Sequence, residues 1–287
     1  MDAIKGSFTV YDQYDKQTNG QAARRAEFPA RVCYNSVGKI TVNSAPRFVA
    51  EKAKLGHGSV LEHGPVYLEL NDQPTVQMDF VRRSRFSVVE ENRVYTNLRV
   101  IHDESYALFK LIVNDQPIEP LGVSYFVPAL NDLHRLVTVD FIVDRGVTHE
   151  IVRNRGKWPG NSFSQESTRY CNYSSEKEGT QITVIEPFFY LEPGREAEYA
   201  VWQEAIEFAE KAYMKLIQLG SKAQEARTVL PQSTKARIFM TSSLVGWKEF
   251  LKLRTPQAAH PQMREVAVPL LQWFQQNIDA EYFTVKI

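Results

Sequence analysis

Arginines and short hydroxyl side chains gather in the segment RNRGKWPGNSFSQESTRY, residues 153–170. Arg153, Arg155 and Arg169 each carry a planar guanidinium whose donors match the oxygens of phosphate or carboxylate groups. Ser167 and its neighbours add hydroxyls that donate or accept hydrogen bonds. The segment therefore predicts a binding site for a polar, anionic ligand. The alternative interpretation of these residue types is a solvated basic loop.

Two predicted elements position this segment. The apolar run TVDFIV at 138–143 predicts a strand, and the spacing of apolar residues after it predicts a helix that begins near Thr148. In such a helix Glu150, Arg153 and Asn154 share one face, because residues three and four apart are neighbours on a helix surface. A carboxylate, a guanidinium and an amide on one face suit a ligand with both a phosphate and a polar ring.

Earlier in the chain, polar residues fall between predicted elements. A helix over 45–55 ends at Gly56, a strand follows over 65–70, and the block GHGSVLEHG lies on their connection. The long stretch 72–136 contains the strand-like runs VYTNLRVI and LGVSYFVPAL and a short helical pattern near 104–113. We interpret it as an elaboration inserted at an edge of the core.

The C-terminal part is predicted to be helical. Apolar residues recur every three or four positions over 195–219, and a second such pattern runs from Leu244 to Arg254. Between them, a helix capped by Ser221 carries Arg227. The two arginines therefore lie at or near helix ends. An ordinary helix-end cation, favoured by the helix dipole, is the alternative interpretation of Arg254.

Composition excludes several classes of protein. The 287 residues are 43% hydrophobic, enough for one sizeable core, so we expect a single domain over 1–287. Lys plus Arg and Asp plus Glu both number 34, and this balance argues against a partner that is a nucleic acid or a membrane surface. Cys33 and Cys171 have no metal-site spacing and cannot form a disulfide framework, which favours a cytoplasmic location. We expect no secretory or membrane-spanning segment.

Four blocks of the chain resemble the flavin-dependent thymidylate synthases, whose signature is Arg-His-Arg, seven residues, then Ser. Here Asn154 replaces the His, and eleven residues, 156–166, separate Arg155 from Ser167. The other blocks are AEFPARVCYNS at 26–36, KLGHGSVLEHGPVYLEL at 54–70, and a C-terminal pair: EARTVLP at 225–231 and WKEFLKLRTPQAAHPQMREVA at 247–267.

The resemblance implies a fold, a reaction and an assembly. The fold is α+β, with a central, mostly antiparallel twisted sheet packed with helices, like the thymidylate synthase complementing proteins. The reaction is reductive methylation of dUMP to dTMP, with FAD as cofactor, methylenetetrahydrofolate as carbon donor and NADPH as reductant. Methylating C5 of uracil requires a ring polarised by fixed charges or by a thiolate, and nothing beside either cysteine suggests an activated thiolate. The family implies a homotetramer with active sites at subunit interfaces.

The same resemblance assigns roles to single residues. On the nucleotide it places Glu150, Arg153, Gln165, Glu166, Ser167, Thr168, Arg169, Arg227 and Arg254. On the flavin it places Ser59 from a neighbouring subunit and, from its own chain, Arg153, Asn154, Arg155 and Gln165. Arg254 matches the arginine credited with stabilising the deprotonated uracil N3, and His57 is expected near the ring. Arg254 and His57 are therefore the predicted catalytic residues.

Other interpretations stay open. His57, Glu62 and His63 could resemble metal ligands, but such groups are more often polar residues of loops and helix ends, so no metal is expected. Ser167 lacks the surroundings of an acyl-transfer nucleophile. Glu150 and the enlarged loop, which includes Trp158, also fit a relative that modifies dCMP or transfers a hydroxymethyl group. Asn154 also fits a non-catalytic nucleotide-binding homologue.

Overall fold

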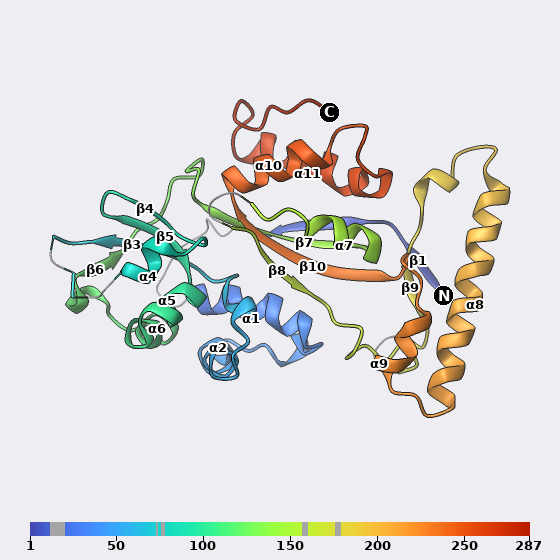
Figure 1. Ribbon diagram of the computed structural model, residues 1–287, viewed down its shortest axis with the longest axis horizontal. Helices are drawn as coiled ribbons and strands as arrows, with labels where there is room; N and C mark the ends of the chain where they lie inside the picture. The colour runs from blue at the N-terminus through green and yellow to red at the C-terminus, as the bar shows by residue number, and fades with distance from the viewer. Residues whose placement is uncertain (12–20, 73, 76–77, 157–159, 176–178) are drawn as a thin grey trace.

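The computed structural model describes residues 1–11, 21–72, 74–75, 78–156, 160–175 and 179–287 (Figure 1). Within these ranges the strands form two four-stranded antiparallel sheets and one parallel pair, and helices pack against them. The predicted α+β class with a mostly antiparallel central sheet is confirmed.

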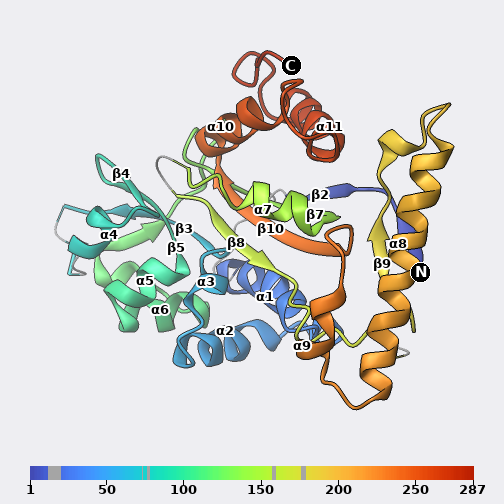
Figure 2. The same cartoon turned by 45° about the vertical axis from the view of Figure 1, so that its right-hand side comes forward.

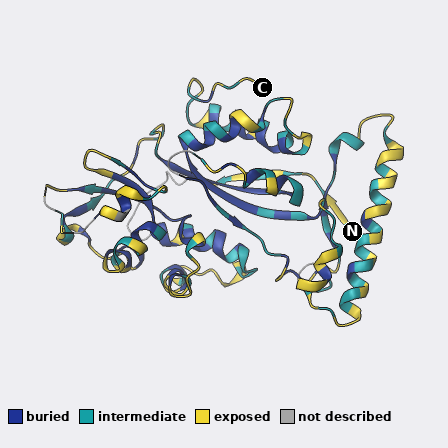
Figure 3. Ribbon diagram, viewed as in Figure 1, coloured by how far each residue is buried: buried dark blue, intermediate teal, exposed yellow. Residues whose placement is uncertain are grey.

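The central sheet has the strand order β2-β7-β10-β8. Its strands are β2 (Ser7–Tyr11), β7 (Leu136–Asp144), β10 (Lys235–Ser243) and β8 (Ser162–Gln165). Alternate residues of β7 and β10 turn an apolar surface toward α7 (Arg145–Ile151), α10 (Leu244–Arg254) and α11 (Pro261–Asn277). This core holds Trp247 and Phe250 fully buried, and both long strands are buried along most of their length (Figure 3). The strand predicted over 138–143 and the helix predicted over 244–254 are therefore present.

The opposite face of the central sheet is polar and lies toward α1 (Gln21–Cys33). The Arg237 Nε donates to Asp140 Oδ2 at 2.8 Å, and the Arg237 guanidinium lies 5.3 Å from the ring centre of Phe28 on α1. The Phe28 and Phe239 rings meet edge to face at 5.7 Å. Burying polar groups is costly unless they are hydrogen-bonded, and these pairs meet that condition on the polar face.

The second sheet has the order β4-β5-β3-β6 and is seen on the left of Figure 1. Its strands are β3 (Pro65–Leu70), β4 (Val88–Glu90), β5 (Arg93–Asn97) and β6 (Val123–Tyr125). It shares one core with α1, α2 (Ser44–Lys54), α3 (Gly58–Leu61), α4 (Asp79–Arg83), α5 (Leu98–Glu104) and α6 (Tyr106–Val113). The elements of 72–136 therefore build onto β3, and the extent of the insertion stays a prediction.

A third layer stands at the other end of the central sheet (Figure 2). It contains the parallel pair β1 (Asp2–Ile4) and β9 (Thr183–Ile185), the long α8 (Glu196–Gln218) and the short α9 (Ala223–Ala226). A 3-10 helix, Arg227–Val229, follows α9 directly. The helix predicted over 195–219 is confirmed within one residue at each end.

Three expectations about local structure are wrong. The run VYTNLRVI is not one strand, because the Asn97 side chain accepts from Val100 N and caps α5 there. The helix that begins after Asp144 ends at Ile151, so Arg153 and Asn154 follow it and do not share a helical face with Glu150. The helix before Arg227 is capped at Lys222, not at Ser221.

Gly64, just before β3, lies in a tight contact with α1 and α5. A Cβ at this position would lie 2.5 Å from the backbone oxygen of Ala22 and 2.7 Å from Leu98 Cδ1. Backbone cannot yield as a side chain does, so we expect Gly64→Ala to lower the free energy of unfolding by about 2 kcal/mol. Gly38→Ala, where nothing lies within 4 Å, is the control and should change it by less than about 0.5 kcal/mol. Equal denaturation midpoints for the two variants would contradict the packing argument.

Candidate functional site

A cavity of about 570 Å³ joins residues that are far apart in the sequence. Its walls come from the end of α1, from residues 56–60, from the edge strand β8 and from the loop that follows β8. Of the predicted site residues, it brings together His57, Ser59, Gln165, Ser167 and Arg169. The volume lies within the range of small-molecule sites.

The His57 side of the cavity is aromatic. Tyr34 Oη lies 2.5 Å from His57 Nδ1, and the two rings stack with their centres 5.8 Å apart. The ring centre of Tyr170, from the loop after β8, lies 6.4 Å from that of Tyr34. Planar rings and polar edges on one wall suit a planar, polar ligand.

The hydroxyl-rich side of the cavity is held by short local contacts. Ser167 Oγ accepts from Arg169 N at 3.4 Å and lies 3.5 Å from Arg169 Nε. The side chain of Arg169 is exposed, while Thr168 is buried and accepts from Arg227 Nη1 at 3.3 Å. The structure thus places Arg227 beside the Ser167–Arg169 turn, and the joint contact of these residues with one anion stays a prediction.

Gln165 and Glu166 turn away from each other. Gln165 lines the cavity and donates to Thr148 Oγ1 of α7 at 3.3 Å. Glu166 pairs with Lys235 at 3.1 Å and is not part of the cavity wall. Their predicted contact with one nucleotide remains a prediction.

Arg254, at the end of α10, contacts Glu150 at the end of α7. Its Nη2 donates to the backbone oxygen of Glu150 at 2.6 Å, and its Nη1 lies 3.5 Å from Glu150 Oε2. Burial lowers the pKa of Arg254, the charge of Glu150 opposes this shift, and the nearby Arg153 adds to it. Within the described part of the chain, the buried Arg254 Nε has no hydrogen-bond partner. None of these three residues lines the cavity.

Asn154 is buried within the motif loop. Its Oδ1 accepts from Gly156 N at 3.2 Å, and its backbone oxygen accepts from Asn161 Nδ2 at 2.9 Å. Asn161 Oδ1 in turn accepts from Ser242 Oγ at 2.5 Å on β10. In this structure the Asn161 side chain therefore anchors the loop to the central sheet through the backbone of Asn154, while Arg155 is exposed. Residues 157–159, with Trp158, lie outside the described residues.

Several residues of the cavity were missed in the sequence. Tyr34 lies inside the block AEFPARVCYNS at 26–36, which was a usable signal, whereas Arg99 had none. Arg99 pairs with Glu62, and burial raises the pKa of that carboxyl. Burial raises the pKa of Cys33 to about 11, so its thiol is neutral near pH 7, in agreement with the expectation of no activated thiolate.

His63 joins the polar face of the central sheet from the same block as His57. It is fully buried, and its Nδ1 lies 2.7 Å from Thr241 Oγ1. Burial lowers the pKa of His63 to about 3. This imidazole is therefore neutral at the pH of the cell and contributes structure rather than charge.

The buried His63 predicts a component of acid sensitivity. Below its ordinary pKa of about 6.5, the unfolded chain binds a proton that the folded chain rejects, so stability falls as the pH drops from about 6.5 toward 3. Between pH 7 and 5 wild type should lose about 2 kcal/mol more than His63→Gln in urea unfolding. His102→Gln, on the surface helix α5, should keep the wild-type dependence. The same pH dependence in His63→Gln as in wild type would refute this role.

Among the described residues, no three His, Cys, Asp or Glu side chains gather as a metal ion would require, and the expectation that the site holds no metal stays a prediction. No helix in the described ranges combines the length and the apolar character needed to cross a membrane.

Comparison with known proteins gives consistent matches. Residues 134–278 match the family model described as thymidylate synthase complementing protein. A flavin-dependent thymidylate synthase of Pyrococcus abyssi is 30% identical over 128 residues, 45% of this chain and 49% of that protein. One of Corynebacterium efficiens is 30% identical over 147 residues, 47% and 55% of the two chains. One of Geobacter sulfurreducens is 29% identical over 129 residues, 45% and 51%. The chain spans about half the length of these relatives.

Proposed function

Because this chain belongs to the thymidylate synthase complementing protein family, we propose that it is a flavin-dependent thymidylate synthase that converts dUMP to dTMP. The cavity is the observation that carries the proposal. It joins His57 and Ser59 of one block to Gln165, Ser167 and Arg169 of another, although about a hundred residues separate the blocks. Methylenetetrahydrofolate supplies the carbon and NADPH the reducing equivalents in this proposal.

The residues of the cavity suit a flavin and a nucleotide. His57 and Tyr170 offer ring faces for a planar heterocycle, and the hydroxyls of Tyr34 and Ser59 add polar groups at the same wall. FAD, when bound there, supplies the hydride chemistry that no side chain provides. Arg153 and Arg155 are exposed and available to anionic groups of either ligand.

The chain's own groups then bind and polarise the substrate. Arg169 and Arg227, beside the Ser167 and Thr168 hydroxyls, hold the phosphate. Arg254 stabilises the negative charge that develops at N3 and O4 of the uracil, and the contacts from Glu150 keep its guanidinium in place before the reaction begins. A neutral Cys33 leaves this polarisation by fixed charge as the route to a nucleophilic C5.

A homotetramer is part of the proposal. Arg254 and Glu150 do not line the cavity that contains Ser167 and Arg169, so one chain offers the two halves of the nucleotide site separately. A second copy that brings its Arg254 to this cavity would complete the site. The cytoplasmic location remains a prediction.

Purified protein tests the proposal directly. We expect bound FAD, seen by its absorption spectrum, and formation of dTMP from dUMP that depends on methylenetetrahydrofolate and NADPH. A methylated product from dCMP instead, identified by its mass, would favour the alternative that Glu150 motivates. A protein that binds dUMP but forms no product would favour a non-catalytic homologue.

A further inference from the structure

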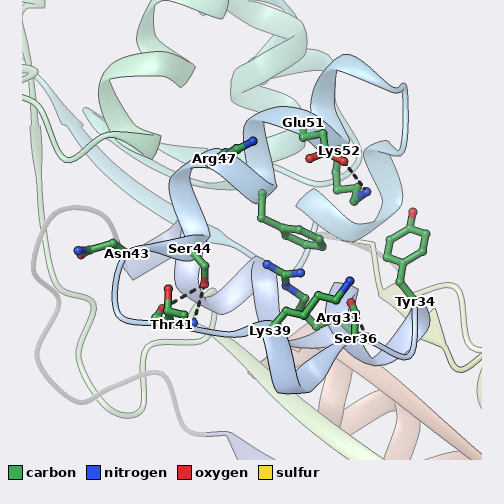
Figure 4. A pocket seen from close by; sticks show the side chains of 11 residues that line it. Arg31, Tyr34, Ser36, Lys39, Thr41, Asn43, Ser44, Arg47, Glu51 and Lys52 are labelled. Carbon is green, nitrogen blue, oxygen red and sulfur yellow. Dashed lines mark hydrogen bonds and ion pairs between the residues drawn. The ribbon is translucent and has the colours of Figure 1, made fainter.

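A second cavity, of about 680 Å³, lies beside the first, between the end of α1 and α2 (Figure 4). Tyr34 stands in the walls of both cavities, so a ligand whose ring occupies the first can extend past Tyr34 into the second. This second cavity belongs to the part of the chain before the family match at 134–278. The mechanism proposed above does not use it.

Positive charge dominates the second cavity. Its lining includes four cationic side chains and one carboxylate: Arg31, Lys39, Arg47, Lys52 and Glu51. The buried Glu27 pairs with Arg31 at 2.9 Å, and Glu51 pairs with Lys52 at 3.1 Å. Lys39 and Arg47 are exposed, and in the described part of the chain neither side chain has an ion pair or hydrogen bond. Two cations are therefore free to meet an anionic ligand.

The pKa of Glu51 reflects the same positive electrostatic potential. A hydrogen bond from Lys52 and the charge of Lys52 lower the pKa of this carboxyl, and Arg47 and Arg31 lower it further. An anion in this cavity is therefore surrounded by favourable charge.

The aromatic faces of the cavity are already covered. The Arg31 guanidinium lies 3.9 Å from the ring centre of Phe48, and the Lys52 Nζ lies 5.1 Å from it. The same Nζ lies 4.7 Å from the ring centre of Tyr34, whose ring also stacks on His57. Phe48 and Tyr34 are the aromatic residues among the described lining, so an adenine ring finds no open face here. The cavity suits a flexible anionic chain without rings.

We propose that the second cavity binds the oligoglutamate tail of the folate whose ring system lies beside the flavin at the first cavity, with Lys39 and Arg47 meeting the tail carboxylates. This inference rests on the proposed function, because that function supplies the folate. A single glutamate stays near Tyr34, and a longer tail reaches the free cations. The protein should therefore discriminate folates by tail length rather than by ring chemistry.

Calorimetric titration tests the tail site without turnover. The full chain, loaded with FAD and dUMP, is titrated with folic acid carrying one or five glutamates, and we expect the longer form to bind about fivefold more tightly at low salt. The advantage should shrink in 0.5 M salt because exposed charges are screened. In the double variant Lys39→Ala/Arg47→Ala the two affinities should converge. Lys54→Ala/Lys110→Ala removes two exposed cations outside the cavity and should keep the advantage.

Each result shows whether the second cavity binds the folate tail or a different anionic group. Equal affinities for the two folates in wild type overturn it. So does a Lys39→Ala/Arg47→Ala variant that keeps the tail-length advantage but loses affinity for FAD or NADPH, because the cavity then serves a pyrophosphate. Tail-length discrimination without dTMP formation would overturn the proposed function and leave the tail site standing.

Discussion

Arg254→Ala is expected to lower kcat for dTMP formation by about 10²- to 10³-fold, the usual loss when a preorganised group that stabilises transition-state charge is removed. Affinity for dUMP should fall by less than about tenfold, because the uracil carries that negative charge only during the reaction. The structure gives a physical basis for this difference. Glu150 holds two nitrogens of the guanidinium, so its charge is fixed in position before the uracil becomes negative.

Two comparisons separate this role from a loss of structure. Arg264→Ala removes a nearby arginine whose Nε donates to Thr255 O and whose Nη1 donates to Gln257, and it should leave kcat within about threefold. Arg254→Lys keeps the charge but not the planar fork, so an intermediate kcat is expected. Steady-state kinetics and equilibrium binding of dUMP on each variant supply both numbers. Equal loss of kcat and of dUMP affinity in Arg254→Ala would argue that Arg254 only binds substrate.

Co-expression of two inactive variants should restore activity if the site is shared between chains. Arg169→Ala removes a guanidinium from the cavity wall, and Arg254→Ala removes the guanidinium at the ends of α7 and α10. In an assembly mixed from equal amounts of both, about one site in four receives both intact halves, because each half is drawn at random. Differently tagged chains, purified through both tags, should therefore show about a quarter of the wild-type kcat.

The matched control pairs two variants from the same half. Glu150→Ala and Arg254→Ala both alter the α7–α10 side, so their mixed assembly should stay inactive. Light scattering on the same samples reports whether a tetramer forms. A tetramer without recovered activity in the first mixture would mean that each chain supplies a whole site to itself, and the proposed sharing would be wrong.

The helices and strands predicted correctly are those in which the local apolar pattern and the burial agree. The long helix α8 and the helix α10 carry apolar residues every three or four positions, and both end where glycine or Thr255-Pro256 interrupts them. The strand β3 is a short apolar run after a glycine, and it was located to the residue. The apolar spacing predicted the wrong helix end near Ile151, where α7 stops early. It also predicted a continuous strand across Asn97, where the side chain of that residue caps α5.

By itself the sequence determined which side chains are available for chemistry: the arginines and hydroxyls of 153–170, the block with His57 and Ser59, and the isolated Arg227 and Arg254. It also identified their family resemblance, which the match over residues 134–278 bears out. Only the tertiary structure decided which of them meet. Antiparallel pairing of β8 with β10, and packing of α1 and α3 against β8, place His57 and Ser59 beside Ser167. The Arg254–Glu150 pair forms instead where α7 and α10 end together. These contacts join residues about a hundred positions apart, and local spacing carries no information about such pairs, since the packing of the whole core selects them.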